Sequence, residues 1–224
     1  MKSPQSSRLA YLLIISPMPN VYVGGAMVTD SRGLPVEFRY TEPIQPSKIQ
    51  QILYGKVLPQ YIKREVIQET LIKSLETQFQ LLLVQDDLLL DYPAKGYSIL
   101  RISETKAAPL GVAGSFQDLS EAECLLQTSA ESSPVRVQQA LVRNPVAGSK
   151  TAEPHTEAAN AAAVAEKQPE EVLAGGRSAL VEKAWLLVEL GSAMDVYEPM
   201  GRVERALETI CKESGLLQPT PART

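Results

Sequence analysis

Three aspartates stand close together in the sequence, around one expected turn. Asp86 and Asp87 follow an apolar segment, and Asp91 comes shortly after them. Carboxylate oxygens are the ligands that Mg²⁺ and Ca²⁺ prefer, so this cluster is a candidate metal site of a phosphoesterase or nuclease. The alternative is turn chemistry at a hairpin, with charges that protect a sheet edge. Because the segment lacks the alternating ligands and central glycine of a calcium loop, we favour the turn.

Histidine-dependent catalysis is not expected. The one histidine, His155, lies in the stretch 144–170, which contains no Leu, Ile, Phe, Tyr or Trp. Such a stretch cannot bury enough apolar surface to offset the entropy of ordering it. A general base must be held within hydrogen-bond reach of its nucleophile. We therefore assign no catalytic residue, no histidine-ligated metal and no cofactor.

The glycine pair and the cysteines also suggest structural roles. Gly24 and Gly25 lie inside an expected strand, whereas a phosphate-binding loop needs glycines between a strand and a helix. We expect a bulge or tight packing there. Cys124 and Cys211 are too few for a disulfide framework, and we expect reduced, partly buried thiols. Whether the two cysteines meet is left open.

Charge and hydropathy bear on the partners. The chain has 22 Lys+Arg against 26 Asp+Glu, a net charge of −4. This balance provides no basic footprint for DNA, RNA or an anionic membrane, so none of these partners is expected. The apolar run Leu9–Ile15 is too short to span a bilayer and lacks a cleavage site, so it predicts a buried strand in a cytoplasmic protein.

The hydrophobic pattern predicts an α+β fold, with a small, mainly antiparallel sheet packed by a long kinked helix or helix pair. Ser47 is a plausible helix N-cap, and Pro59 interrupts the helical pattern that follows. The strands are expected at 9–15, 21–29, 36–41, 79–84, 88–92 and 97–103.

The composition also predicts a division of the chain. We expect an α+β domain over residues 1–143, with its core at 8–104. A disordered Ala/Glu/Pro-rich linker follows over 144–172, then a C-terminal helical hairpin over 173–216. Residues 217–224 form a tail.

One expected strand places Val36, Phe38 and Tyr40 on one face and Glu37 and Arg39 on the other. We expect the first face to pack against the long helix and the charged face to be exposed. Arg and Tyr are favoured at interaction hot spots, so Glu37, Arg39 and Tyr40 form a candidate partner-binding surface. The alternative is a solvated sheet face with ion pairs between strands.

The C-terminal segment supplies further candidate partner-binding residues, Trp185, Tyr197 and Met200. These side chains are either intramolecular core or anchors for the groove of a partner. The sequence therefore favours a non-catalytic protein-interaction module: an adaptor, a regulator or an assembly subunit. Its protein partner is unidentified, and a homo-oligomer is possible. The alternative is a carboxylate- and metal-dependent hydrolase, such as a phosphoesterase or nuclease.

Overall fold

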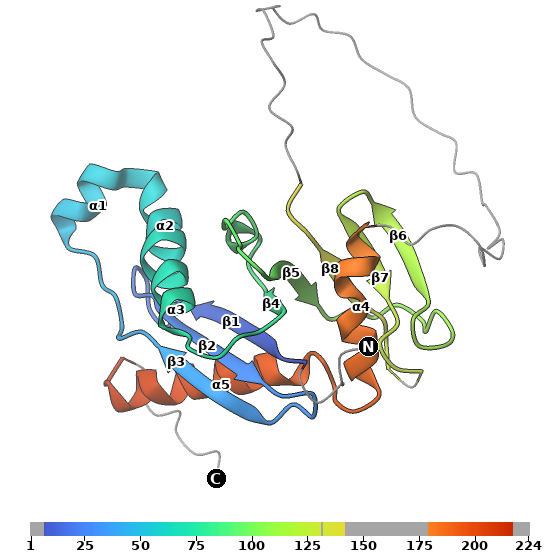
Figure 1. Ribbon diagram of the computed structural model, residues 1–224. Helices are drawn as coiled ribbons and strands as arrows, with labels where there is room; N and C mark the ends of the chain where they lie inside the picture. Colours follow the sequence, from blue (N-terminus) through green and yellow to red (C-terminus); the bar gives the residue numbers. More distant parts are fainter. Residues whose placement is uncertain (1–6, 131, 142–178, 217–224) are drawn as a thin grey trace, which may run out of the picture.

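The protein is described by a computed structural model in which residues 7–130, 132–141 and 179–216 are placed. These residues form a mixed eight-stranded sheet with the order β3-β2-β1-β4-β5-β8-β7-β6, flanked by helices (Figure 1). The α+β class is confirmed, but the sheet is large rather than small. The strands are β1 (Leu9–Ile15), β2 (Val23–Thr29), β3 (Pro35–Tyr40), β4 (Leu81–Val84), β5 (Ser98–Ser103), β6 (Phe116–Ser120), β7 (Glu123–Leu126) and β8 (Val135–Gln138).

The sheet is mixed because the chain crosses from one side of β1 to the other. From β1 it continues antiparallel into β2 and β3 on one side. It then crosses over and adds β4 parallel to β1, and β5 parallel to β4, on the other side. Strands β8, β7 and β6 extend the sheet antiparallel. Parallel neighbours need a long crossover, which the helices after β3 supply.

The crossover consists of two consecutive helical stretches that are divided at Gly55, in agreement with the predicted helix pair (Figure 1). It comprises α1 (Lys48–Tyr54), the 3₁₀ turn η2 (Gly55–Val57), α2 (Leu58–Tyr61), the π-helix η3 (Ile62–Gln68) and α3 (Glu69–Ser74), and the second stretch is continuous from α2 to α3. Ser47 caps α1 as predicted: its hydroxyl accepts a hydrogen bond from the backbone of Gln50, whose side chain accepts one from Ser47 N–H at 2.8 Å. Pro59 lies in the first turn of α2, where its missing N–H leaves no bond unmade.

Helices cover both faces of the central strands, which explains why β1 is apolar throughout. Tyr11 belongs to one core cluster together with Leu207 of α5 (Glu198–Glu213). Leu12 points the opposite way, into a second cluster with Ile67 and Leu71 of the crossover. Figure 1 shows α5 running along one side of β1–β3, with the crossover helices on the other.

The two C-terminal helices are present, but a helical hairpin is not confirmed. Helix α4 (Ala179–Gly191) packs against β7, whereas α5 packs against β1 and β2. Each helix buries its apolar face on the sheet, so the sheet takes the place of a partner helix. None of the helices in the described part of the chain combines the length and apolar character that a membrane crossing requires.

One expected strand is wrong. The segment 88–92 begins with the 3₁₀ turn η4 (Asp87–Leu89), which is capped by Asp86. The Asp86 carboxylate accepts a hydrogen bond from Leu88 N–H at 3.0 Å, and this local bond competes with strand formation. The expected linker 144–172, the tail 217–224 and His155 lie outside the described residues.

Candidate functional site at the carboxyl ends of β1 and β4

The order of the strands reverses between the neighbouring parallel strands β1 and β4. Strand β1 leads to β2 on one side, and β4 leads to β5 on the other. Leu12 of β1 and Arg101 of β5 both pair with Val84, so the three parallel strands end at one edge. Such a switch point, at the carboxyl ends of parallel strands, is where open α/β sheets bind their ligands.

A pocket of about 360 Å³ lies at this edge. Strand β1 contributes apolar side chains to it, whereas the segment after β4 and the neighbouring β5 contribute charged and amide groups. We call it the switch-point pocket. Its lining residues are Leu12, Leu13, Ile14, Gln85, Asp86, Asp87, Leu89 and Arg101.

Asp86 is held by a lysine from the crossover. The Lys63 Nζ atom lies 2.7 Å from Asp86 Oδ2. The Lys63 side chain is 23% exposed and the Asp86 side chain is 31% exposed, so the pair is mostly buried. Lys63 belongs to the π-helix η3, and π-helical turns often occur at functional sites because they re-aim side chains. The π-helix thus brings a cation to the carboxyl end of β4.

Asp87 is held by an arginine from β5. The Arg101 Nε atom lies 2.8 Å from Asp87 Oδ1 and donates to the Gln85 carbonyl oxygen at 2.8 Å. Its terminal nitrogen donates to Gln138 of β8 at 2.9 Å, so three groups from two segments fix the guanidinium. Gln85 in turn donates from Nε2 to the Tyr197 hydroxyl at 2.8 Å, which brings Tyr197 to this edge.

The carboxylates of the pocket do not fit a divalent cation as they stand. No group of three His, Cys, Asp or Glu side chains suited to a metal occurs within the described ranges. Asp86 and Asp87 each face a cationic partner, so the local charges cancel. Asp91 does not line the pocket, and within the described part of the chain only its backbone carbonyl accepts a hydrogen bond, from Arg64 at 3.4 Å. Mg²⁺ and Ca²⁺ require several oxygen ligands and a net negative site.

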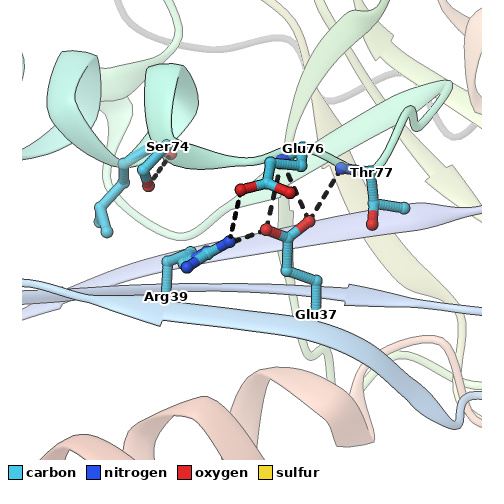
Figure 2. A network of polar contacts seen from close by, with 6 residues as sticks. Glu37, Arg39, Ser74, Glu76 and Thr77 are labelled. Atoms are coloured by element: carbon cyan, nitrogen blue, oxygen red, sulfur yellow. Dashed lines mark hydrogen bonds and ion pairs between the residues drawn. The ribbon is translucent and has the colours of Figure 1, made fainter.

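The predicted partner-binding strand is oriented differently from our expectation. Only 10% of the Glu37 side chain is exposed, because its carboxylate accepts hydrogen bonds from the backbone N–H groups of Glu76 and Thr77 (Figure 2). Arg39 is half-exposed and pairs with Glu37 at 2.9 Å and with Glu76 at 3.1 Å. These charged side chains therefore fasten β3 to the segment after α3.

The apolar side of β3 is correspondingly more exposed than predicted. Val36 and Tyr40 are 47% and 54% exposed, and only Phe38 packs against the core on the α5 side. The physical reason is that β3 is the edge strand of the sheet, whereas α5 packs on the neighbouring strands β1 and β2. Tyr40 stacks on Phe38 with ring centroids 5.9 Å apart.

The other predicted partner-binding residues lie apart from β3. Met200 is fully buried in the core between α5 and the sheet, which leaves it no surface to offer. Trp185 packs against the same core from α4, and Tyr197 is partly buried beside Gln85. A partner-binding role of the remaining exposed residues stays a prediction.

Sequence reasoning missed Lys63 and Arg101 as members of a site. A usable signal existed for Arg101, since a charged residue inside the apolar strand Ser98–Ser103 needs a partner. No local signal marked Lys63, because its proximity to Asp86 depends on the crossover and the π-helix.

Comparison with known proteins identifies the fold. No family model matches the chain, and no curated protein matches it by sequence. Endonuclease V from Streptomyces avermitilis is similar in structure, with a TM-score of 0.52, 13% identity, and coverage of 95% of this chain and 84% of that one. The catalytic domain of human endonuclease V is similar with a TM-score of 0.50 and 14% identity, covering 96% of this chain and 88% of that one. This chain has an endonuclease V-like fold.

The likeness corrects two expectations. The prediction of a non-catalytic adaptor or regulator is contradicted, because the two solved structures that share this fold are endonucleases. The expectation of no nucleic acid partner is corrected by the same finding. That expectation rested on net charge, and a value of −4 for the whole chain does not describe the charge of any single surface.

Proposed function

We propose that nucleic acid is the ligand of this chain, and that a phosphodiester group lies in the switch-point pocket. The observation that supports this proposal most directly is the position of the pocket at the carboxyl ends of the parallel strands, where Arg101 lines it and Lys63 is paired with Asp86, another lining residue. The endonuclease V-like fold supports the same class of ligand.

The two cations suit a phosphate group. Asp87 is 63% exposed, so its ion pair with Arg101 is worth little and exchanges readily. A guanidinium can donate two parallel hydrogen bonds to phosphate oxygens, and an ammonium adds a point charge. Hydrogen bonds to Gln85 and Gln138 hold Arg101 in place, and the β1 side chains form the apolar side of the pocket.

Phosphodiester cleavage is a second candidate function, favoured by one observation. Asp86 and Asp87 both line the pocket in which the phosphodiester would lie. Each carboxylate is paired with a cation, so bound nucleic acid must first break the ion pair before that carboxylate can take part in cleavage. Binding and cleavage are therefore separable, and each needs its own assay.

Binding is tested with fluorescein-labelled single-stranded and duplex oligonucleotides, by anisotropy over a salt series. Lys63→Gln should weaken binding and reduce the slope of log affinity against log salt by about 0.9 on duplex, or about 0.7 on single strands. Lys73→Gln is the matched control, because Lys73 pairs with Glu69 on α3 away from the pocket. Equal losses for both variants, or no binding by the native chain, would overturn the proposal.

Cleavage is tested on the same oligonucleotides, with and without Mg²⁺ or Mn²⁺, by resolving products on denaturing gels. Products that disappear in Asp86→Asn and Asp87→Asn, and persist in Asp91→Asn, would establish a nuclease at this pocket. Binding without products from the native chain would reject the nuclease and leave nucleic acid binding as the function.

A further inference from the structure

The first helices of the crossover carry an apolar surface that the fold leaves uncovered. Within α1, η2 and α2, which we call the crossover arm, six apolar or aromatic residues are exposed, with fractional exposures from 40% to 75%. Exposed apolar patches of this kind mark surfaces that bind a membrane or another macromolecule. The six residues are Ile49, Ile52, Leu53, Tyr54, Val57 and Tyr61.

The arm stands out from the sheet. Helix α1 has no buried residue, and Leu58 is the buried residue of α2. Figure 1 shows α1 at the far end of the crossover, beyond the edge of the strands. The ring centroids of Tyr54 and Tyr61 lie 5.1 Å apart, and this contact joins α1 to α2.

The charged side chains of the crossover arm are all basic. The sequence contains no Asp or Glu between Glu42 and Glu65, whereas that interval contains Lys48, Lys56, Lys63 and Arg64. Lys63 is engaged with Asp86. Among the described residues, neither Lys48 nor Lys56 forms an ion pair, so both are available to an anionic partner.

We propose that the crossover arm docks on an anionic phospholipid surface. Aliphatic side chains would enter the boundary between headgroups and acyl chains, tyrosines would lie at headgroup level, and lysines would reach lipid phosphates. The arm lies in the surface and does not span it, because α1 and α2 are short. This revises the expectation, drawn from net charge, that no membrane is bound.

Charge complementarity favours lipid over the other occupants. Two copies of the arm packed together would bring their lysines face to face, which disfavours a homodimer through this surface. Nucleic acid would satisfy the lysines and could stack on the tyrosines. It would leave the strongly exposed Ile49, Ile52 and Leu53 in water, whereas a bilayer satisfies both the charges and the aliphatic groups.

The test is co-sedimentation of the full chain with vesicles of phosphatidylcholine alone or of phosphatidylcholine with phosphatidylglycerol. The native chain should bind the anionic vesicles and not the neutral ones. Leu53→Glu should lower the vesicle partition coefficient by about tenfold or more, and Lys56→Gln by about fivefold at low salt. Val112→Glu is the matched control, because Val112 is as exposed as Leu53 (75% each) but lies outside the arm.

Three results would overturn the proposal. One is equal binding to neutral and anionic vesicles, and another is an equal loss in Leu53→Glu and Val112→Glu. The third is a native chain that does not bind vesicles but instead self-associates or binds oligonucleotides, in a way that Leu53→Glu abolishes. Unchanged circular dichroism and melting of Leu53→Glu would exclude unfolding as the cause. The lipid proposal is independent of the pocket, which Lys63→Gln tests separately.

Discussion

The carboxylate of Glu37 accepts a hydrogen bond from the backbone N–H of Thr77 at 2.8 Å, 40 residues further along the chain. The same carboxylate accepts from the N–H of Glu76, so one side chain on the edge strand satisfies two donors just beyond α3 (Figure 2). The crossover returns to the sheet at this point. Glu37 therefore joins the edge of the sheet to the end of the crossover.

Glu37→Gln should destabilise the protein at neutral pH. Burial alone would raise the pKa of Glu37, but hydrogen bonds from Thr77, Glu76 and Arg39 outweigh burial and lower this pKa from 4.5 to about 2. A lowered pKa adds stability above pH 4.5 that is lost as the pH falls toward 2. We expect the substitution to reduce the free energy of unfolding by about 2 kcal/mol at pH 7, and less at pH 3, in urea titrations.

Glu76→Gln is the control for this prediction. The Glu76 side chain is 86% exposed and meets only Arg39, so its loss should change the free energy of unfolding by less than about 1 kcal/mol. If Glu37→Gln were equally mild, or if its effect persisted unchanged at pH 3, the carboxylate would not be the group that fastens this edge.

Tyr11→Phe should destabilise the junction between β1 and α5. Tyr11 is fully buried, and its hydroxyl donates to the Val196 carbonyl at 3.1 Å. Removing the hydroxyl leaves a carbonyl unpaired in the core, which costs about 1–2 kcal/mol. Tyr97→Phe is the control, because the Tyr97 ring packs on Phe79 and its hydroxyl has no hydrogen bond among the described residues. Equal midpoints for both variants in urea would contradict the prediction.

Local signals in the sequence were sufficient for several elements. The apolar run Leu9–Ile15 forms a strand with the predicted bounds, and the Ser47 hydroxyl caps α1 by accepting a hydrogen bond from the backbone of Gln50, three residues away. The tight packing predicted for Gly24 and Gly25 is confirmed, since added Cβ atoms would press on Ile67 and Leu207 respectively. Each of these features depends on hydrophobic pattern or on short-range hydrogen bonds, which the sequence displays directly.

The parts that sequence reasoning missed depend on distant pairing. The parallel register of Leu12 with Val84 joins segments separated by the whole crossover, and no local pattern records it. The candidate site follows from that register, because it brings Arg101 to Asp87. Glu37 was assigned to a solvent-exposed face because charged residues usually face water, yet two backbone donors on another segment turn it inward.

Both cysteines should resist modification in the folded protein. Cys124 and Cys211 are free, as predicted, and they are fully buried, which is more than the partial burial expected. Burial, with Asp118 and Glu123 nearby, raises the pKa of Cys124 to about 12, and burial near Glu208 raises that of Cys211. Thiolates are the reactive form, so Ellman's reagent at pH 8 should label neither thiol quickly. In guanidinium both should react, and fast labelling of the native protein would show that a thiol is accessible.

Gly25 and Leu207 should be energetically coupled. A Cβ atom at Gly25 would lie 2.9 Å from Leu207 Cδ2, so Gly25→Ala should cost about 1–3 kcal/mol through overpacking of α5 on β2. Leu207→Ala alone should lower the free energy of unfolding by about 2–5 kcal/mol, because the shorter side chain leaves a cavity. The double variant should lose less stability than the sum of the two single losses, by about 1 kcal/mol or more, because the new methyl group enters that cavity. Gly201→Ala is the control: a Cβ there meets only Arg205 at 3.6 Å, and alanine in a helix should add about 0.5–1 kcal/mol. Strict additivity in urea unfolding of the cycle would show that α5 does not seat on Gly25 as described.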